Sequence, residues 1–437
     1  MRRIFGSYAY SDAPRMGCWW DETATRPDWP EARGDLRADV AVIGGGFTGL
    51  SAALHLAEAG ADVALLDAEY PGWGASGRNG GFCCLGGAKL SAAQFARAYG
   101  PEQARDFHRA EVEAVHLVAR LLDRLGINAD THSRGETQLA HNRRAMDRLR
   151  RAAEAEDGAV VTEPAGLAGE GMAGSFHGAL TRPVGFGLNP RKYVLGLARA
   201  AAAAGARLYQ KSPAQRIGKT GTTYRIALPQ GDLQAGTVLL CTNGYSSEDV
   251  PGWLAGRYIP AQSTVLVTRP LTDAELAAQG WTSDQMAYDT RNLLHYFRLM
   301  PDRRFLFGMR GGLTSTPRAE AAARARTRAD FEAMFPAWRG VESAHMWSGM
   351  VCLARNRVPF AGPVPGEPGL FAGLAYHGNG VAMGSYAGRL LADLAQGRAP
   401  DLPYPEPMRH PMRRFPLGRA RRLLMPPLYA ALALGDL

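Results

Sequence analysis

The chain has 437 residues, of which 46% are hydrophobic and 21% are charged. These values are typical of a folded globular protein and exclude a disordered or fibrous chain, and the length suits two or three domains around a shared cleft. The net charge of +9 is spread along the chain and forms no basic stripe with interleaved aromatic residues, so nucleic-acid binding is not expected.

No apolar run is long enough to cross a bilayer, and the basic N-terminus turns polar before a signal-peptide core could form. We therefore expect a cytoplasmic protein without a membrane span. The five cysteines are an odd, scattered set that predicts reduced thiols, with Cys83 and Cys84 packed as small apolar residues. The histidines lack the spacing of a helical metal pair, so no metal site is expected.

The strongest motif follows a short apolar run at residues 38–43, which predicts a buried parallel strand. The next residues are Gly44-Gly45-Gly46-Phe47-Thr48-Gly49. In this G-x-G-x-x-G spacing, Gly44 permits a tight turn, Gly46 allows a pyrophosphate to approach the backbone, and Gly49 allows helix and strand to pack closely.

A helix is predicted from about residue 50 to Gly60, and its free N-terminal amides would face the phosphates. Residues 62–67 read as the second strand. That strand ends at Asp67, about 20 residues beyond the loop, where an acid binds ribose hydroxyls. The complete unit predicts a dinucleotide site, but NAD and FAD share it.

The elements further along the chain are predicted from the same signals, namely apolar runs, helix caps and turn residues. Residues 91–187 are expected to be rich in helix and residues 251–344 rich in strand. Asn189-Pro190 opens a helix to about Ala204 that leads into a strand at 206–209. Two further strands, at 238–241 and 370–375, each end in a turn, and a helix is predicted at 381–394.

The run Gly72-Trp73-Gly74-Ala75-Ser76-Gly77-Arg78-Asn79-Gly80-Gly81-Phe82 resembles the second flavin-contacting loop of the D-amino-acid oxidase and glycine oxidase superfamily. Within it, the chain is similar to the gamma-glutamylputrescine oxidoreductase group. Further matching segments are Cys18-Trp19-Trp20, Gly34-Asp35-Leu36, Thr242-Asn243-Gly244-Tyr245, Tyr296-Phe297-Arg298, Phe307-Gly308, Trp347-Ser348-Gly349 and Tyr376-His377-Gly378-Asn379-Gly380-Val381.

This resemblance implies an α/β fold. A Rossmann-type FAD-binding domain would be assembled from residues 36–90, 188–250 and 345–400. A substrate-binding domain with a mixed or antiparallel sheet would comprise residues 91–187 and 251–344, followed by a C-terminal extension at 401–437. Together with the loop motif, it predicts FAD contacts at Gly44, Gly46, Phe47, Thr48, Gly49, Asp67, Ala75, Ser76, Arg78, Asn79, Gly80, Gly81, Thr242, Asn243, Gly244, Gly378, Asn379, Gly380 and Val381.

The implied activity is oxidation of a C–N bond in a small amine or amino acid, such as a gamma-glutamyl-polyamine or an N-methyl amino acid. Hydride transfer to FAD would give an imine that water hydrolyses, with oxygen or another acceptor reoxidising the flavin. Two alternatives stay open: a dehydrogenase of a hydroxy acid or glycerol phosphate, and an FAD-carrying subunit of a larger electron-transfer complex.

Three residues are candidates for the substrate side. Alternation along one predicted strand places Tyr296 and Arg298 on the same face, and the arginine would clamp a carboxylate or else serve structure. His377 would face the substrate or simply satisfy loop carbonyls.

The sequence departs from its relatives at several positions. Leu306 stands where sarcosine oxidases carry a lysine that promotes reaction with oxygen, so the acceptor is open. Ser348 replaces the cysteine that tethers their flavin, with Cys352 offset from it, so FAD is expected to bind non-covalently. Val351 and Cys352 stand near the position of a carboxylate-gripping arginine, which shifts weight toward an amine or a distant carboxylate.

The tail carries five arginines before the apolar residues 423–434. It would pack back on the protein as a helix or rest on an anionic membrane, and its prolines favour the first arrangement.

Overall fold

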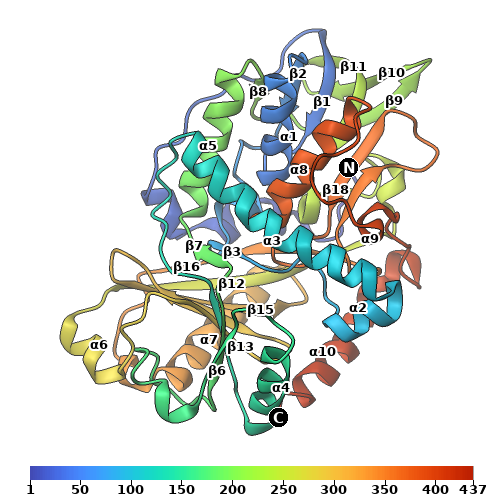
Figure 1. Ribbon diagram of the computed structural model, residues 1–437. Helices are drawn as coiled ribbons and strands as arrows, with labels where there is room; N and C mark the ends of the chain where they lie inside the picture. The colour runs from blue at the N-terminus through green and yellow to red at the C-terminus, as the bar shows by residue number, and fades with distance from the viewer. Residues whose placement is uncertain (437) are drawn as a thin grey trace.

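The structure is a computed structural model that describes residues 1–436, and within them the strands form two eight-stranded sheets and one two-stranded sheet. The two large sheets lie in opposite halves of the molecule (Figure 1). This architecture confirms the predicted α/β class with a second, mainly antiparallel sheet.

The first sheet has the order β17-β18-β11-β1-β2-β8, and β10 and β9 extend it from β11 as a hairpin. The five strands from β18 to β8 run parallel. The strands are β1 (Leu36–Ile43), β2 (Val63–Leu66), β8 (Arg207–Tyr209), β9 (Arg216–Thr220), β10 (Thr223–Leu228), β11 (Gly231–Leu240), β17 (Phe360–Pro363) and β18 (Leu370–Leu374).

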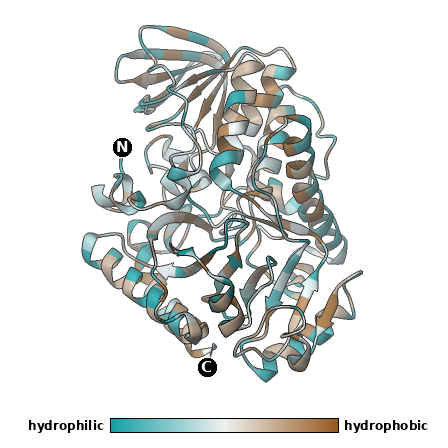
Figure 2. Ribbon diagram, turned by 90° about the vertical axis from the view of Figure 1, so that its left-hand side faces the viewer, coloured by the Kyte–Doolittle hydropathy of each residue, from teal (hydrophilic) through white to brown (hydrophobic). Residues whose placement is uncertain are grey.

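Both faces of this sheet are buried. Val40 and Val42 belong to one apolar cluster, and Ala41 and Ile43 to another. Such burial on both faces explains the continuous apolar run of β1. Helix α1 (Phe47–Glu58) packs between α5 (Pro190–Ala203) and α8 (Ala382–Ala395), and α3 (Pro101–Arg124) lies against α8. In Figure 2, apolar brown patches alternate with polar teal ones along the helices of this half.

The second sheet has the order β16-β12-β15-β14-β13-β4-β6-β5 and is antiparallel except between β13 and β4. Its strands are β4 (Glu136–Leu139), β5 (Val160–Thr162), β6 (Ala179–Arg182), β12 (Tyr258–Pro270), β13 (Met286–Asp289), β14 (His295–Leu299), β15 (Arg304–Gly312) and β16 (His345–Ala354). The remaining two strands, β3 (Phe82–Cys84) and β7 (Gly185–Gly187), pair with each other.

Helices α6 (Asp273–Gln279) and α7 (Pro317–Met334) accompany the second sheet, whose core is rich in aromatic rings. Phe297 of β14 lies in this core and contacts Trp281 edge-on, with the two ring centroids 5.4 Å apart. Because alternate residues of a strand face opposite sides, Tyr296 and Arg298 lie on the face turned away from these rings. The other helices are α2 (Ala92–Tyr99) and α4 (Arg143–Ala153).

Two chain segments differ from their expected assignment. Residues 345–354, which we placed with the FAD-binding segments, form β16 and pair with β12 at the edge of the second sheet. The 91–187 segment supplies α3 to the helices around α8, while it supplies β4, β5 and β6 to the second sheet. Strand partners separated by about a hundred residues are chosen by tertiary pairing, which local periodicity does not report.

The C-terminal segment packs back on the protein. It contains α9 (Glu406–Arg409) and α10 (Met425–Leu434), and the latter ends near the loop after β13, where Asn292 Nδ2 donates to Leu432 O at 3.3 Å. Met425 is buried, whereas Leu428 and Leu434 are exposed. Within residues 1–436, no helix is long and apolar enough to cross a membrane.

His295 forms a buried ion-pair bridge between β14 and α7. Its Nδ1 lies 2.8 Å from Asp289 Oδ2, and its Nε2 lies 3.2 Å from Asp330 Oδ2. Burial opposes its charge, but the hydrogen bonds to the two carboxylates raise the pKa of His295 above its ordinary value. The bridge is therefore strongest when the imidazole is protonated.

The H295Q variant is expected to be less stable than the wild type by about 1.5–3 kcal/mol at a pH near 6, as for hydrogen bonds to charged groups. Because the folded-state pKa is raised, this stabilisation is fully present below the unfolded pKa of about 6.5 and is lost as pH rises through the folded value. Thermal unfolding midpoints of both proteins across this range measure the effect. An equal midpoint difference at every pH would contradict it.

Candidate active site

Two cavities adjoin between the two sheets. The first has a volume of about 200 Å³ and lies at the glycine loop after β1, and the second, of about 240 Å³, lies against the second sheet. They share six lining residues: Ala75, Asn79, Met350, Val351, Gly378 and Val381. A ligand in one cavity would therefore lie beside a ligand in the other along this shared wall.

The glycine loop occupies the carboxyl end of the parallel strands. A Cβ at Gly44, whose φ is +106°, would lie 2.7 Å from Cys241 O, and a Cβ at Gly49 would lie 1.9 Å from Gly44 O. A Cβ at Gly46 would lie 2.8 Å from Ser76 Oγ. A side chain at position 44 or 49 would therefore collide with backbone atoms, whereas one at position 46 would displace the Ser76 hydroxyl. The loop backbone lines the cavity, as a dinucleotide pyrophosphate requires.

Helix α1 starts at Phe47 directly behind this loop. The Phe47 amide donates to Ser76 Oγ at 2.9 Å, so the second loop is held against the helix N-terminus. Thr48 Oγ1 lies 2.8 Å from the hydroxyl of Tyr376, which ties α1 to the turn before α8. The positive end of the α1 dipole points at the cavity, which suits phosphate oxygens.

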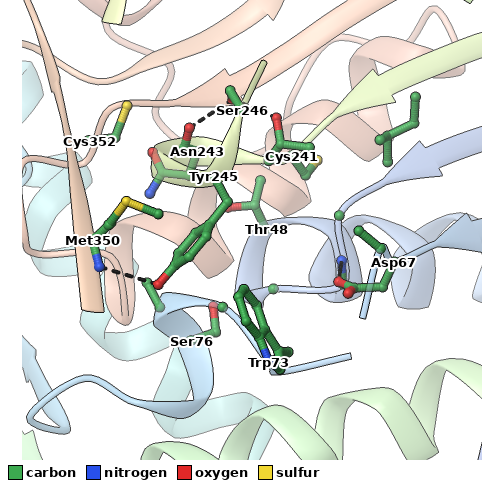
Figure 3. Close-up of a pocket in the computed structure, with 18 of the residues that line it drawn as sticks. Thr48, Asp67, Trp73, Ser76, Cys241, Asn243, Tyr245, Ser246, Met350 and Cys352 are labelled. Atoms are coloured by element: carbon green, nitrogen blue, oxygen red, sulfur yellow. Dashed lines mark hydrogen bonds between the residues drawn. The ribbon is translucent and has the colours of Figure 1, made fainter. Parts of the chain in front are cut away.

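Asp67 stands at the end of β2, as predicted for the ribose-binding acid. Its Oδ2 accepts from the Gly45 amide at 2.8 Å and its Oδ1 from the Glu69 amide at 2.9 Å. Figure 3 shows Asp67 at the edge of this pocket. Burial raises the pKa of Asp67 to about 6, against these hydrogen bonds, which lower it. The carboxylate is thus fixed beside the loop and lines the first cavity.

The second loop places Ala75 and Asn79 on the shared wall and Ser76 in the first cavity. Asn79 donates to Ala75 O and accepts from the Gly81 amide at 2.8 Å, which closes the loop on itself. Arg78 lines the second cavity, but its Nε and Nη2 donate to Trp73 O at 3.0 and 2.7 Å. Its guanidinium therefore braces the loop.

The turn after β11 also reaches the first cavity. Thr242 and Asn243 line it, and Asn243, with a φ of +44°, accepts from the Ala375 amide at 2.9 Å. Gly244 packs against the backbone of β16, since a Cβ there would lie 3.2 Å from Val351 O. Figure 3 shows Tyr245 beside this turn, with its hydroxyl accepting from the Met350 amide at 3.3 Å.

The C-terminal glycine turn closes the shared wall. Gly378, Gly380 and Val381 line the first cavity, and α8 begins at the next residue. Asn379 lines the second cavity, where its Nδ2 donates to Leu85 O at 2.6 Å and its Oδ1 accepts from Arg310 at 3.2 Å. The amino end of α8 is therefore directed at this wall.

Of the three substrate-side candidates, only Tyr296 lines the second cavity. Arg298 lines neither cavity; it is buried, and its Nη2 donates to Leu188 O at 2.7 Å. His377 lines neither cavity as well: its Nδ1 lies 2.7 Å from Gly87 O and its Nε2 accepts from the Ala354 amide at 3.1 Å. Burial lowers the pKa of His377 to about 4, which keeps it neutral.

Polar residues that the sequence did not single out line the second cavity. They are Lys89, Glu136, Ser263, Tyr288 and Arg310. Arg310 lies in β15, inside the segment that we expected to be rich in strand, but a single arginine in a strand carries no motif. Glu136 lies in β4, inside a segment that we expected to be helical. The first cavity is likewise lined by Met1, Arg3 and Tyr10, for which no local signal exists.

The positions at which this sequence differs from its relatives lie in a buried polar site, in an apolar cluster and along the cavities. Ser348 is buried and its Oγ donates to Glu320 at 2.8 Å, and Leu306 is part of an apolar cluster. Val351 lies on the shared wall, and Cys352 lines the first cavity, where burial raises the pKa of its thiol to about 12.

Comparison with known proteins agrees with this geometry. Residues 39–394 match the DAO family of FAD dependent oxidoreductases. The chain is 33% identical over 392 residues to a probable oxidoreductase OrdL of Rhizobium meliloti (strain 1021), covering 88% of this chain and 89% of that protein. It is 30% identical over 370 residues to gamma-glutamylputrescine oxidoreductase of Escherichia coli (strain K12), covering 83% and 85%.

Among solved structures, glycine oxidase from Geobacillus kaustophilus superposes with a TM-score of 0.72 at 20% identity, covering 86% of this chain and 98% of that one. The glycine cradle, the acid after β2 and the two flanking turns fit the cofactor that this family uses. The expected class, an FAD-dependent amine or amino-acid oxidoreductase, is thereby confirmed at the level of the family. The chain belongs to the DAO family of FAD-dependent oxidoreductases.

Proposed function

We propose that the protein oxidises a C–N bond of a small amine or amino acid, giving an imine that water hydrolyses to a carbonyl compound and the released amine or ammonia. The observation that carries this proposal is the wall shared by the two cavities, one built of dinucleotide-binding loops and the other lined by buried polar side chains. Bound FAD supplies the hydride acceptor for this reaction.

The chain's own contribution is to place the donor carbon at the shared wall and to keep water away. Tyr296 is central to this role because its ring lies flat against the backbone, with a Cβ at Gly308 falling only 2.0 Å from Tyr296 Cζ. Phe82 packs edge-on against it, with the ring centroids 5.4 Å apart. A rigid wall of this kind fixes the distance between substrate and cofactor.

Arg298 and His377 act in this proposal as positioning residues. Arg298 bridges the backbone of residue 188 and the ring of His132, with Nη1 and Nε2 2.9 Å apart. His377 joins the loop at Gly87 to the end of β16. The amino end of α8 adds a positive dipole at the shared wall, which favours the negative charge that a two-electron reduction leaves there.

Anaerobic titration of the purified holoenzyme tests the function. Polyamines, N-methyl amino acids, gamma-glutamyl-amines and hydroxy acids are added in turn while the visible absorption of the flavin is recorded. Bleaching by a nitrogen compound, with release of ammonia or an amine, is the expected result. Bleaching only by a hydroxy acid would replace the proposal with the dehydrogenase alternative, and a flavin that no compound bleaches would favour the electron-transfer subunit.

FAD is expected to be bound non-covalently, so denaturation of the protein should release it intact. Ser348 has no thiol, and the thiol of Cys352 is kept protonated by burial, so neither is a ready nucleophile. Acid precipitation of the holoenzyme should therefore leave a colourless pellet and a yellow supernatant that contains unmodified FAD by mass spectrometry. Yellow colour retained in the pellet, in a peptide that contains Cys352, would contradict this expectation.

A further inference from the structure

The N-terminal segment forms part of the wall of the first cavity. Residues 1–10, here called the N-terminal strap, contribute three lining residues: Met1, Arg3 and Tyr10. The carboxylates of Asp67 and Glu69 line the same cavity, and within residues 1–436 Arg3 is the only arginine or lysine that does so. The strap therefore brings a guanidinium to a cavity whose other charged side chains, in the described chain, are acids.

The guanidinium of Arg3 is not paired with an anion. Its Nε is buried without a hydrogen-bond partner, and among residues 1–436 it forms no salt bridge, whereas the neighbouring Arg2 pairs with Asp249, with Nε and Oδ2 3.7 Å apart. The Arg3 guanidinium carbon lies 4.3 Å from the centroid of the Tyr10 ring, which offers no strong acceptor. A buried charged donor without a partner is costly, and an anionic ligand group in the cavity would remove that cost.

The backbone just before Arg3 is fixed by the turn at residues 248–249. The Arg2 amide donates to Asp249 Oδ1 at 2.6 Å, and the Glu248 amide donates to Arg2 O at 2.9 Å. Glu248 is itself held by the C-terminal segment, since its Oε1 lies 2.8 Å from Nη2 of the buried Arg421. The two ends of the chain therefore meet beside the first cavity.

The C-terminal segment also fixes the backbone just after Arg3. Nη1 of Arg422 donates to Ile4 O at 3.4 Å, and its Nη2 donates to Leu313 O at 3.0 Å. The same guanidinium lies 4.5 Å from the centroid of the Phe5 ring, which is buried. With its backbone held on both sides, the strap keeps Arg3 at the cavity wall.

The phosphates of FAD need more positive charge than the glycine loop supplies. Each phosphate of the cofactor is anionic, whereas the N-terminus of α1 provides the equivalent of about half a positive charge. Arg3 is close enough to Glu69, just after β2, to lower the pKa of that carboxyl group, against burial and Asp12, which raise it. A guanidinium is well suited to phosphate because its planar fork donates two parallel hydrogen bonds.

We propose that the N-terminal strap closes the first cavity over bound FAD, where Arg3 donates hydrogen bonds to the phosphates and Arg422 keeps the strap in place. Retention of the cofactor is thereby assigned to segments that lie outside residues 39–394, the part of the chain that matches the DAO family. The proposal concerns the cofactor alone and does not depend on which substrate is oxidised.

Three ligands separate the phosphates from the rest of the cofactor. FAD and ADP both carry a pyrophosphate, whereas adenosine has the same base and ribose without it. Their dissociation constants for the full-length apoprotein are measured by calorimetry and, for FAD, by flavin fluorescence. R3Q is expected to weaken FAD and ADP by about 10- to 100-fold and to leave adenosine unchanged, because charge-assisted hydrogen bonds contribute that range. R3K should recover part of the loss, since lysine keeps the charge without the fork.

A second variant tests the anchor of the strap. R422Q should weaken FAD and ADP by about 2- to 10-fold, the net value of an ordinary hydrogen bond. In a protein that already carries R3Q, the same change should have no further effect, because the strap has then lost its contact with the phosphates. R216Q removes an exposed arginine of β9 and should match the wild type with all three ligands. Circular dichroism verifies the fold of each variant.

The proposal would be overturned if R3Q bound FAD and ADP as the wild type does. It would equally fail if R3Q weakened adenosine as much as ADP, a result that would place Arg3 against the base or reveal a damaged fold. Equal effects of R422Q with and without R3Q would show that Arg422 does not act through the strap. Because binding is measured without turnover, the strap can be confirmed while the proposed oxidation fails, and the reverse.

Discussion

Replacing Gly49 with alanine is expected to yield a folded but colourless protein. The new Cβ would lie 1.9 Å from Gly44 O, a backbone atom that cannot move without shifting the loop. Overpacking of this kind costs about 1–3 kcal/mol of stability. The displaced loop also loses the close approach of the α1 amides to the cofactor phosphates, and we expect FAD to bind at least about 100-fold more weakly, equal to about 3 kcal/mol.

The measurement is a titration of apoprotein with FAD, followed by the change in flavin fluorescence, together with circular dichroism to verify the fold. G218A is the matched control, because a Cβ at Gly218 meets nothing within 4 Å and the residue lies in β9, away from both cavities. An alanine variant at position 49 that binds FAD as the wild type does would remove the glycine loop from the cofactor site.

The second large effect concerns pH. We expect kcat/KM of the best substrate to be bell-shaped with a maximum near neutral pH, since both cavity charges have pKa values of about 7. We expect Glu136, which lines the second cavity, to act in its ionised form, so kcat/KM rises as pH passes its raised pKa. We expect Lys89, on the same cavity, to act in its protonated form, so kcat/KM falls as pH passes its lowered pKa. The pH dependence of kcat/KM reports the pKa values of groups in the free enzyme.

Neighbouring groups shift the pKa of each of these two residues. Around Glu136 they are Arg182, Cys84, Tyr288 and Glu111. The cation that acts on Lys89 is Arg310, and Lys89 in turn acts on His377. The pKa of His377, about 4, lies well below the acid limb, so this histidine does not contribute to the profile.

Two variants identify the limbs of the bell. E136Q should remove the acid limb and lower kcat/KM by about 10- to 100-fold at the optimum, the value of a charged hydrogen bond. K89M should remove the alkaline limb with a smaller loss, because Arg310 remains as a second cation of the same cavity. The lysine control is K219M, on exposed β9. If both limbs persist in both variants, they belong to the substrate amine or to other groups of the enzyme.

The cofactor half of the site could be predicted because its signals are local. The apolar run of β1, the three glycines and Asp67 occupy one continuous stretch of 32 residues from position 36 to 67, and each has a conformational requirement that only certain residues meet. The structure adds the reason for each glycine, such as the contact of position 44 with Cys241 O. Contacts of this kind depend on β11 lying beside β1.

The substrate half could not be predicted in the same way. Arg298 shares its strand and its face with Tyr296, yet its guanidinium is buried outside both cavities and bonded to Leu188 O. Arg310, one strand further, lines the cavity instead. Both are arginines in β-strands, and only their tertiary contacts distinguish them: Arg298 bonds to Leu188 O and His132, and Arg310 to Asn379.

The sequence by itself determined the family, the parallel core of the first sheet and the loops that line the first cavity, because these depend on backbone conformation and burial within short segments. Only the tertiary structure decided that β16 joins the second sheet, that Arg298 and His377 brace loops, and that Lys89, Glu136 and Arg310 line one cavity. Those three charges come from segments up to about 220 residues apart. Burial of apolar surface as the two sheets pack supplies the free energy that brings them together, and no local pattern encodes that packing.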